Sequence, residues 1–543
     1  MMTHRGFAWR AVPAFAAFLL VAPAGRAARG ANLGKVPRYH VLEVALSGPR
    51  QGPSDTPARD VELAVSFRHE AGGETVRAVG FWDGDGKGGP TGGVFKVRFC
   101  PTRVGRWRIV RTESNRRELK GLREGDELVC VPSEHPGRWI PDGRWYKRSD
   151  GSHQYIVGNT HYTFLSRRTD KGAAKTDPVA DIRGNAKYFK KLRFSPGGGR
   201  YTHPTDKPFL DDKGRPSDDG LFSLRPNPTW FHQRVDPAIR EGFATDLICD
   251  IILCGPDTRE IRSTLQGDST PWLRYLAGRY GAYPNVWFCL CNEWNIKQPS
   301  YKAEQIVRAG RAIRASLPQA TGVSVHGNTG NWDTHLNGAW HDHVTIQWKL
   351  KRLDRAADAA AANYARGGKK PVCNDENAYE GDGDRFSEGD VIEGCFGTFL
   401  GGGYPTTGEK YAGKKGQYFW GGFDAAKHHA ADNLLLLREY VDECVTFWQM
   451  GPIDTKGSIF SSLPEGSRLL GEEPGEYVLG TNRQAKDIRA NLPAGTWRIT
   501  QIDLMTKRKE TLGEASSGKF TFATPPSRAA MTHFRRINPP GPK

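Results

Sequence analysis

The chain lacks the features that would place it in several common classes of protein. No run of apolar residues is long enough to span a bilayer, and no cluster of cysteine or histidine has the spacing of a zinc site. His341 and His343 lie two residues apart, but no third ligand follows at a suitable distance along the chain. We therefore expect no stable membrane insertion, no bound metal and no cofactor.

Cysteine is also scarce. The 543 residues contain nine cysteines, an odd number and a density far below that of a disulfide scaffold. Five of them lie in or beside apolar runs and are interpreted as small buried hydrophobic residues: Cys249, Cys254, Cys289, Cys291 and Cys373. Cys100 and Cys130 are the one candidate pair for a bridge in the first domain, and the sequence leaves that pairing open.

Negative charge is in deficit. The formal net charge is +17, from 77 Lys and Arg against 60 Asp and Glu. A basic surface attracts polyanions. No nucleic-acid motif appears, so the expected partner is a polysaccharide or oligosaccharide substrate, and an acidic one fits the charge. The alternative is a dispersed basic surface without a specific partner.

The N-terminus has the pattern of a signal peptide. Arg5 and Arg10 supply positive charge, the run 11–22 is apolar but short, and small residues follow at 22–24 and 27–28. Residues 1–28 are predicted to be removed, so that the mature protein begins between Gly25 and Asn32. The predicted location is secreted, periplasmic or at the cell surface. An uncleaved anchor helix is the alternative.

Short apolar runs separated by turn residues indicate a β-sandwich of the immunoglobulin-like kind over residues 36–133. The expected strands are 41–46, 61–67, 95–99 and 107–111. The segment Asp83-Gly-Asp-Gly-Lys-Gly88 resembles the start of a calcium loop. It fails as an EF-hand because Lys87 stands at the fifth position and Val94 at the twelfth, where glutamate is required. We interpret it as a hairpin turn.

Apolar runs alternate with helical stretches over residues 140–455, which predicts a (β/α)₈ TIM barrel. Plausible helices include 301–317 and 354–366, and 433–446 would close the domain. A doubly wound sheet is the alternative, but the segment after the first strand is not a glycine-rich phosphate turn. Residues 470–537 are β-rich again and are predicted to form a second, smaller sandwich. The eight expected barrel strands are 155–157, 191–194, 245–253, 286–290, 322–325, 344–346, 371–373 and 394–397.

Two of these strands end in glutamate. The run Val286–Leu290 leads into Asn292 and Glu293, and a later strand leads into Glu376. The two glutamates are 83 residues apart, which three βα steps of roughly 28 residues each would fill. Catalytic groups of barrel enzymes lie at the carboxyl ends of strands, and two carboxylates at one rim are what glycosidic bond cleavage needs.

The chain resembles bacterial clan A glycoside hydrolases of a three-part kind. The barrel is similar to the apiosidase-like group at Asp150-Gly151, Gly158-Asn-Thr160, Asn292-Glu293 and Pro371–Glu376 with Tyr379-Glu-Gly381. The N-terminal part is similar to the sandwich that precedes such barrels, at Ser47-Gly-Pro49, Gly80-Phe-Trp-Asp-Gly84, Val97-Arg-Phe99 with Pro101, and Gly105-Arg-Trp107. The C-terminal part resembles an appended sandwich of the collagen-binding type, a family label that by itself assigns no collagen binding. The loops at Gly197–Gly199 and Gly401–Tyr404 depart from the pattern.

The resemblance implies that Glu293, ending the fourth strand, is the acid/base and Glu376, ending the seventh, is the nucleophile. Asp375 and Glu380 are rival nucleophiles, although Asp375 should point to the opposite side of its strand. Surface ion pairs are the non-catalytic alternative for both glutamates, and packing or structural pairing is the alternative for each further candidate. These further candidates for substrate binding are Asn292, Arg193, His161, Tyr162, His326, Gln347 and Trp348.

These observations predict a secreted, retaining glycoside hydrolase that cleaves a polysaccharide or its side chains by double displacement. The main alternative is a catalytically silent glycan-binding or cell-surface protein with the same barrel. A polysaccharide lyase is a more distant alternative, and it would make the two glutamates dispensable. The sugar, the linkage and exo or endo action do not follow from the sequence.

Overall fold

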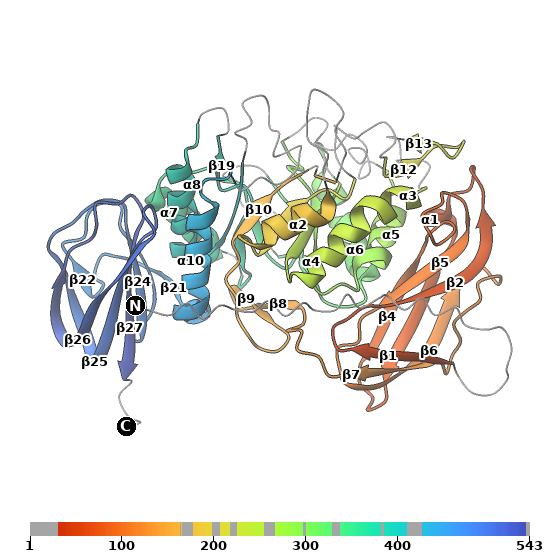
Figure 1. Ribbon diagram of the computed structural model, residues 1–543, viewed down its shortest axis with the longest axis horizontal. Helices are drawn as coiled ribbons and strands as arrows, with labels where there is room; N and C mark the ends of the chain where they lie inside the picture. Colours follow the sequence, from red (N-terminus) through yellow and green to blue (C-terminus); the bar gives the residue numbers. More distant parts are fainter. Residues whose placement is uncertain are drawn as a thin grey trace.

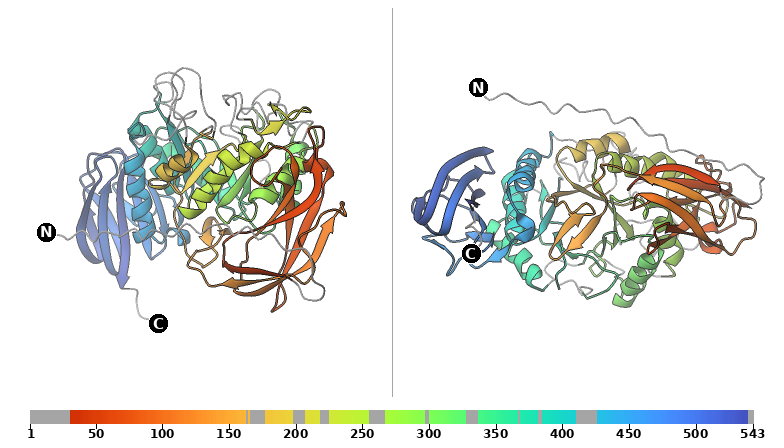
Figure 2. Two further views of the ribbon diagram at one scale, coloured as in Figure 1. Left: turned by 45° about the vertical axis from the view of Figure 1, so that its right-hand side comes forward. Right: turned by 90° about the horizontal axis from the view of Figure 1, so that it is seen from below.

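The computed structural model describes residues 31–162, 164–165, 177–197, 207–217, 225–254, 267–296, 300–327, 337–366, 368–381, 385–409 and 426–538. A β-rich N-terminal part, a central α/β part and a β-rich C-terminal part follow one another along the chain (Figure 1). The two β-rich parts lie on opposite sides of the central part in every view (Figure 2). The predicted signal peptide lies outside the described residues, and so does Arg200, a basic residue that we expected near the barrel rim.

The N-terminal part is one sheet of seven strands in the order β1-β7-β6-β3-β4-β5-β2. Side chains from all its strands meet in one buried cluster that includes Leu46, Val65, Phe99, Trp107 and Leu128. β4 and β5 are antiparallel neighbours, so the segment between them, which contains Asp83–Gly88, joins the arms of a hairpin as predicted. The strands are Asn32–Pro37 (β1), Leu42–Gln51 (β2), Leu63–His69 (β3), Thr75–Trp82 (β4), Gly92–Phe99 (β5), Gly105–Ser114 (β6) and Glu127–Val131 (β7).

In the described residues, the central part contains a parallel sheet of nine strands. Eight of them follow the order β16-β15-β14-β11-β10-β20-β18-β17, and β19 (Tyr379–Glu380) pairs with β20 beside this path. A backbone hydrogen bond from Asp342 N–H to the carbonyl of Val323 (2.9 Å) joins the two ends of this path, which gives the sheet a barrel-like form. The strands are Gly158–Thr160 (β10), Lys191–Phe194 (β11), Ile248–Cys254 (β14), Val286–Cys291 (β15), Val323–Ser324 (β16), Val344–Ile346 (β17), Val372–Asn374 (β18) and Tyr404–Glu409 (β20).

The prediction for the eighth strand was wrong. Residues 394–397 lie inside helix α8 (Glu388–Leu400), which begins with a capping box between Ser387 and Asp390. The true strand, β20, follows the glycine-rich turn at 401–403, which the sequence suggested was only a loop. It was missed because it is polar: Thr406 and Thr407 are buried and bond Asp375 and the Ala378 carbonyl. The first strand was misplaced by three residues, since the ladder forms at β10 rather than at 155–157.

Helices cover the outside of the barrel-like sheet (Figure 1). The predicted helices 301–317, 354–366 and 433–446 correspond to α6 (Ala303–Ser316), α7 (Leu353–Arg366) and α10 (Ala431–Cys444). A π-helical turn, η1 (Phe231–Val235), leads into α4 (Asp236–Ala244). The central part also contains helices α2 (Pro178–Ala186), α3 (Pro228–Trp230) and α5 (Thr270–Tyr280).

The C-terminal part is one antiparallel sheet in which β26 extends the path β21-β23-β24-β27-β25-β22. One face has its own core around Tyr477, Trp497 and Phe534. Leu470 and Val478 belong to the other face and share a core with residues of α8 and α10. The strands are Gly451–Ile453 (β21), Phe460–Ser461 (β22), Arg468–Glu472 (β23), Glu476–Thr481 (β24), Ile488–Asp503 (β25), Arg508–Phe522 (β26) and Ala530–Asn538 (β27).

All nine cysteines are free thiols, and eight of them are buried. The bridge considered between Cys100 and Cys130 is therefore not formed. Burial, together with the neighbouring Cys100, raises the pKa of the Cys130 thiol to about 12. Within the described ranges, no helix is both long and apolar enough to cross a membrane.

Candidate active site

Glu293 follows directly after β15 in a backbone conformation that is rare for glutamate. Its φ angle is +48°, in the left-handed region that costs an L-residue free energy. The turn is held on both sides, because Asn292 N–H donates to the Cys254 carbonyl (3.3 Å) and Trp294 N–H to the His326 carbonyl (3.1 Å). Backbone strain that persists at a strand end is typical of functional sites. Only 8% of Glu293 is exposed.

Glu376 lies two residues beyond β18, is 3% exposed, and is surrounded by donors. Tyr162 Oη donates to its Oε1 at 2.5 Å, while Gln347 Nε2 (2.9 Å) and Lys349 Nζ (3.5 Å) contact its Oε2. Burial by itself would raise the pKa of this carboxyl. The charges of His326, Lys349 and Arg193 and the bond from Tyr162 outweigh burial and lower the pKa to about 2.

A single amide group joins the two glutamates. Gln347 Nε2 donates to Glu293 Oε1 at 2.6 Å and to Glu376 Oε2 at 2.9 Å. By the triangle inequality these two oxygens are no more than about 5.5 Å apart. This upper limit is compatible with the carboxyl spacing of retaining glycosidases (about 5–5.5 Å). The structure therefore brings the two predicted catalytic residues together, and Gln347 lies between them.

Arg193 and Asn292 form the floor under this pair. Arg193 is fully buried and donates to Asn292 Oδ1 (2.8 Å) and to Tyr162 Oη (3.2 Å). His326 Nδ1 also contacts Asn292 Oδ1 at 2.8 Å, so the ring must carry its proton there. Arg193 therefore reaches the candidate nucleophile Glu376 through the hydroxyl of Tyr162.

The rival nucleophiles have other roles. Asp375 is fully buried and forms an ion pair with Lys191, and it accepts a hydrogen bond from Thr406 Oγ1 at 3.0 Å. Although burial would raise its pKa, the charges of Lys191 and Arg193 hold that pKa well below its ordinary value. Asp375 is therefore a structural anion in the barrel interior.

Glu380 is also fully buried, on the short strand β19 (Tyr379–Glu380). It accepts from the backbone N–H groups of His429 (3.1 Å) and Ala430 (3.0 Å), directly before α10, and contacts the rings of His428 and His429. This carboxylate therefore anchors the start of α10 and not the reaction centre.

His161 and Trp348, the remaining predicted residues, differ in burial and contacts. His161 is fully buried, donates its backbone N–H to the Arg193 carbonyl (3.0 Å) and packs its ring against Phe164 (4.9 Å between centroids). It supports the site from behind. Trp348 is half-buried, and its backbone is clamped by the side chain of Asn374. Unlike His161, Trp348 is therefore partly accessible to solvent.

Lys349 was expected only as a basic residue near the barrel rim, and Tyr379 only as part of the sequence resemblance, but both lie close to the candidate nucleophile. Lys349 Nζ lies 4.7 Å from the centroid of the Tyr379 ring as well as beside Glu376, and Tyr379 Oη is 3.4 Å from Tyr162 Oη. A signal was available for Lys349, because strand alternation carried past β17 puts it on the same side as Gln347. Among the described residues, no group of three or more His, Cys, Asp or Glu could hold a metal ion.

Two parts of the chain match models of known protein families. Residues 200–406 match the family described as "Apiosidase-like, catalytic domain", and residues 35–114 match DUF5060, a domain of unknown function. No curated protein matches the chain.

Two solved structures from Bacteroides vulgatus ATCC 8482 share the fold. One is a candidate glycoside hydrolase, with a TM-score of 0.75 and 18% identity over 93% of this chain and 100% of that one. The other is a glycoside hydrolase of family 5, with a TM-score of 0.60 and 13% identity over 75% of this chain and 94% of that one. The family match supports glycoside hydrolase activity, and residues 200–406 are similar to an apiosidase-like catalytic domain, as the sequence resemblance predicted.

Proposed function

We propose that this protein is an exported, retaining glycoside hydrolase built on a (β/α)₈ barrel, with Glu376 as nucleophile and Glu293 as acid/base. The observation that carries the proposal is the position of Gln347 Nε2, within hydrogen-bond distance of both carboxylates. That arrangement keeps the two contacted oxygens within about 5.5 Å of each other, which supports direct attack by one carboxylate over attack by an intervening water.

In the first step a Glu376 oxygen attacks the anomeric carbon while Glu293 protonates the departing glycosidic oxygen. The bond to the leaving group breaks, and an ester between Glu376 and the sugar forms. In the second step the Glu293 carboxylate takes a proton from water, the hydroxide attacks the anomeric carbon, and Glu376 leaves as a carboxylate. The lowered pKa of Glu376 suits a group that must be ionised at the start and must leave at the end.

The test is a Glu376 variant series on purified protein, using the polysaccharides and aryl glycosides that the wild type cleaves. Glu376→Gln should keep its fold and lose turnover, because an amide cannot act as this nucleophile. With Glu376→Gly, azide should occupy the vacated space and yield a glycosyl azide of inverted configuration. Substantial activity in Glu376→Gln would refute the assignment. Binding to glycans without turnover in the wild type would instead favour the silent glycan-binding alternative.

We further propose that the substrate is acidic and that the protein is exported. The net charge of +17 and the Lys349 ammonium beside the candidate nucleophile both favour an anionic glycan. The Michaelis constant should then rise between low and moderate ionic strength, since the screening length falls to about 10 Å at 0.1 M. A neutral oligosaccharide that is cleaved best, without salt dependence, contradicts the substrate class. Exported protein whose N-terminus still carries Arg5 contradicts signal removal.

A further inference from the structure

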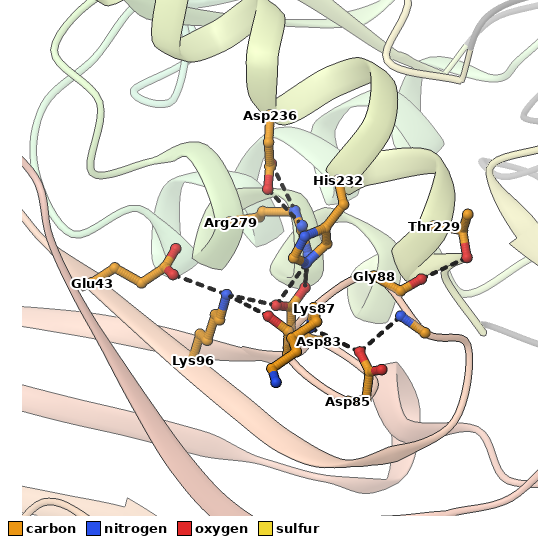
Figure 3. Close-up of polar contacts among 12 residues, drawn as sticks. Glu43, Asp83, Asp85, Lys87, Gly88, Lys96, Thr229, His232, Asp236 and Arg279 are labelled. Carbon is orange, nitrogen blue, oxygen red and sulfur yellow. Dashed lines mark hydrogen bonds and ion pairs between the residues drawn. The ribbon is translucent and has the colours of Figure 1, made fainter. Parts of the chain in front are cut away.

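The Asp83–Gly89 loop, which resembles a calcium loop in sequence, is occupied by protein groups. Asp83 is fully buried, and its carboxylate contacts His232 Nε2 (2.9 Å to each oxygen), Arg279 Nη1 (2.7 Å) and Lys96 Nζ (2.7 Å). Figure 3 shows that His232 and Arg279 reach Asp83 from the helices of the central part. The loop is therefore a contact between two domains.

The backbone of the loop fits the same helices closely. Asp85 Oδ1 accepts from the N–H groups of Lys87 (2.8 Å) and Gly89 (2.7 Å), which fixes the turn. The Gly88 carbonyl accepts from Thr229 Oγ1 at 2.6 Å (Figure 3). Gly88 has a φ of +101°, and a Cβ added there would be 3.3 Å from His232 Cβ. The backbone of the loop therefore packs closely against His232 at this glycine.

A second carboxylate extends this contact. Asp236, at the start of α4, bonds Arg279 through Nε (2.9 Å) and Nη2 (2.7 Å), and Arg98 of β5 lies 3.3 Å away. Arg98 and Lys96 both pair with Glu43 of β2 (2.8 and 2.9 Å). Three cations and three carboxylates thus balance in a buried cluster that spans both domains, and breaking such a cluster is costly.

Segment 228–235, which comprises α3 and η1, carries Thr229 and His232 and also contacts two loops of the candidate active site. Trp230 Nε1 donates to the Pro196 carbonyl at 2.7 Å. Arg234 donates to the carbonyls of Leu165, through Nε, and Phe164, through Nη2 (3.5 Å). Both side chains are buried. Pro196 follows the strand that carries Arg193, and Phe164 and Leu165 follow Tyr162 by two and three residues.

These two loops also bond each other, since Ser195 N–H donates to the Tyr162 carbonyl at 3.1 Å. Tyr162 in turn is the donor 2.5 Å from Glu376 Oε1. The segment 228–235 therefore touches the N-terminal domain through Thr229 and His232, and the active-site loops through Trp230 and Arg234. It also includes the π-helical turn η1, a form found mostly at functional sites.

We propose that the Asp83–Gly89 loop of the N-terminal domain is a positioning element for the candidate active site, and that it acts through segment 228–235. The N-terminal domain holds Thr229 and His232, and the segment then fixes the carbonyls that set the places of Tyr162 and Arg193. Neither Thr229 nor His232 touches the candidate catalytic residues, so both are positioning residues.

The test compares amide hydrogen exchange, peptide by peptide, in the full-length wild type and in Thr229→Val/His232→Phe. This variant removes the two donors to the loop but leaves the Asp83 pairs with Arg279 and Lys96. Losing a hydrogen bond to a charged group should speed exchange about tenfold in peptides that cover 158–162 and 191–197. Peptides of β17 and β18 should be unchanged. Thr229→Ser/His232→Gln, which keeps both donors, should restore the wild-type rates.

Arg77→Ala is the matched control, because Arg77 pairs with Glu113 on the exposed side of the same domain. This control should leave the amide exchange rates unchanged in every peptide of the central part. Faster exchange confined to 228–244, or no change at all, overturns the proposal. If the double variant does not fold, Thr229→Val alone should move the same two peptides. Exchange needs no substrate, so its outcome is independent of the proposed hydrolase activity. With an aryl glycoside that the wild type cleaves, the double variant should have a lower kcat and an unchanged KM.

Discussion

The hydroxyl of Tyr162 is the shortest contact of Glu376, and removing it should move the acid limb of the pH profile. The bond from Tyr162 Oη to Glu376 Oε1 is 2.5 Å long, and the pKa of Glu376 is lowered to about 2. A hydrogen bond to a charged group contributes about 1.5–3 kcal/mol. One pKa unit corresponds to about 1.36 kcal/mol, so Tyr162→Phe should raise the pKa of Glu376 by about one to two units, to about 3–4.

The assay is kcat/KM for an activated aryl glycoside between pH 2.5 and 7, measured in short pH-jump reactions. The acid limb of this profile reports the nucleophile of the free enzyme. Tyr379→Phe is the control, because it removes a hydroxyl 3.4 Å from Tyr162 Oη, and it should shift the limb less. A fully folded Tyr162→Phe protein with an unmoved acid limb would refute the assignment of Glu376 as the ionised nucleophile.

Stability gives a second readout of the same group. The pKa of Glu376 in the folded protein lies below the ordinary value of 4.5, so its ionised form stabilises the fold above about pH 4.5. This stabilisation, about 3 kcal/mol by the size of the shift, is lost as the pH falls from about 4.5 towards 2. In Tyr162→Phe the folded-state pKa of Glu376 is higher, so the loss of stability on acidification should be complete at a higher pH. Urea unfolding at a series of pH values would measure this.

Three further variants test other parts of the structure. Glu293→Ala should slow substrates with poor leaving groups far more than activated aryl glycosides, which need little protonation; equal losses in kcat/KM count against the acid/base role. Gln347→Leu removes the donor shared by Glu293 and Glu376 and should lower kcat about 10²-fold, while a change within twofold would contradict its bridging position. Asp236→Asn should lower the free energy of unfolding by about 3–5 kcal/mol because it leaves buried guanidinium groups unbalanced. The exposed Asp432→Asn should change it by under about 1 kcal/mol in the same urea titration, and equal losses would refute the interface.

Local patterns predicted much of the central fold. Strands β11, β14, β15, β17 and β18 and helices α6, α7 and α10 lie within a few residues of their predicted places. Each combines a run of apolar residues with a clear polar end, and both are local properties of the chain. The prediction of the eighth strand failed because β20 has no such local run of apolar residues. Thr406 and Thr407 of β20 are polar, and only the buried Asp375 and the Ala378 carbonyl beside them make a buried strand there favourable.

The sequence by itself determined which two glutamates follow strands of the central sheet, because a strand and the residue after its end are read in order along the chain. Only the tertiary structure decided how those glutamates are held. Tyr162 comes from the loop after β10 and Gln347 and Lys349 from the loop after β17, and they meet at Glu376 across gaps of up to 214 residues. The balance between burial, which raises the pKa of a carboxyl, and nearby cations, which lower it, depends on distances of a few ångströms in space. No spacing along the chain encodes those distances, so the ionisation of the candidate nucleophile follows from the fold alone.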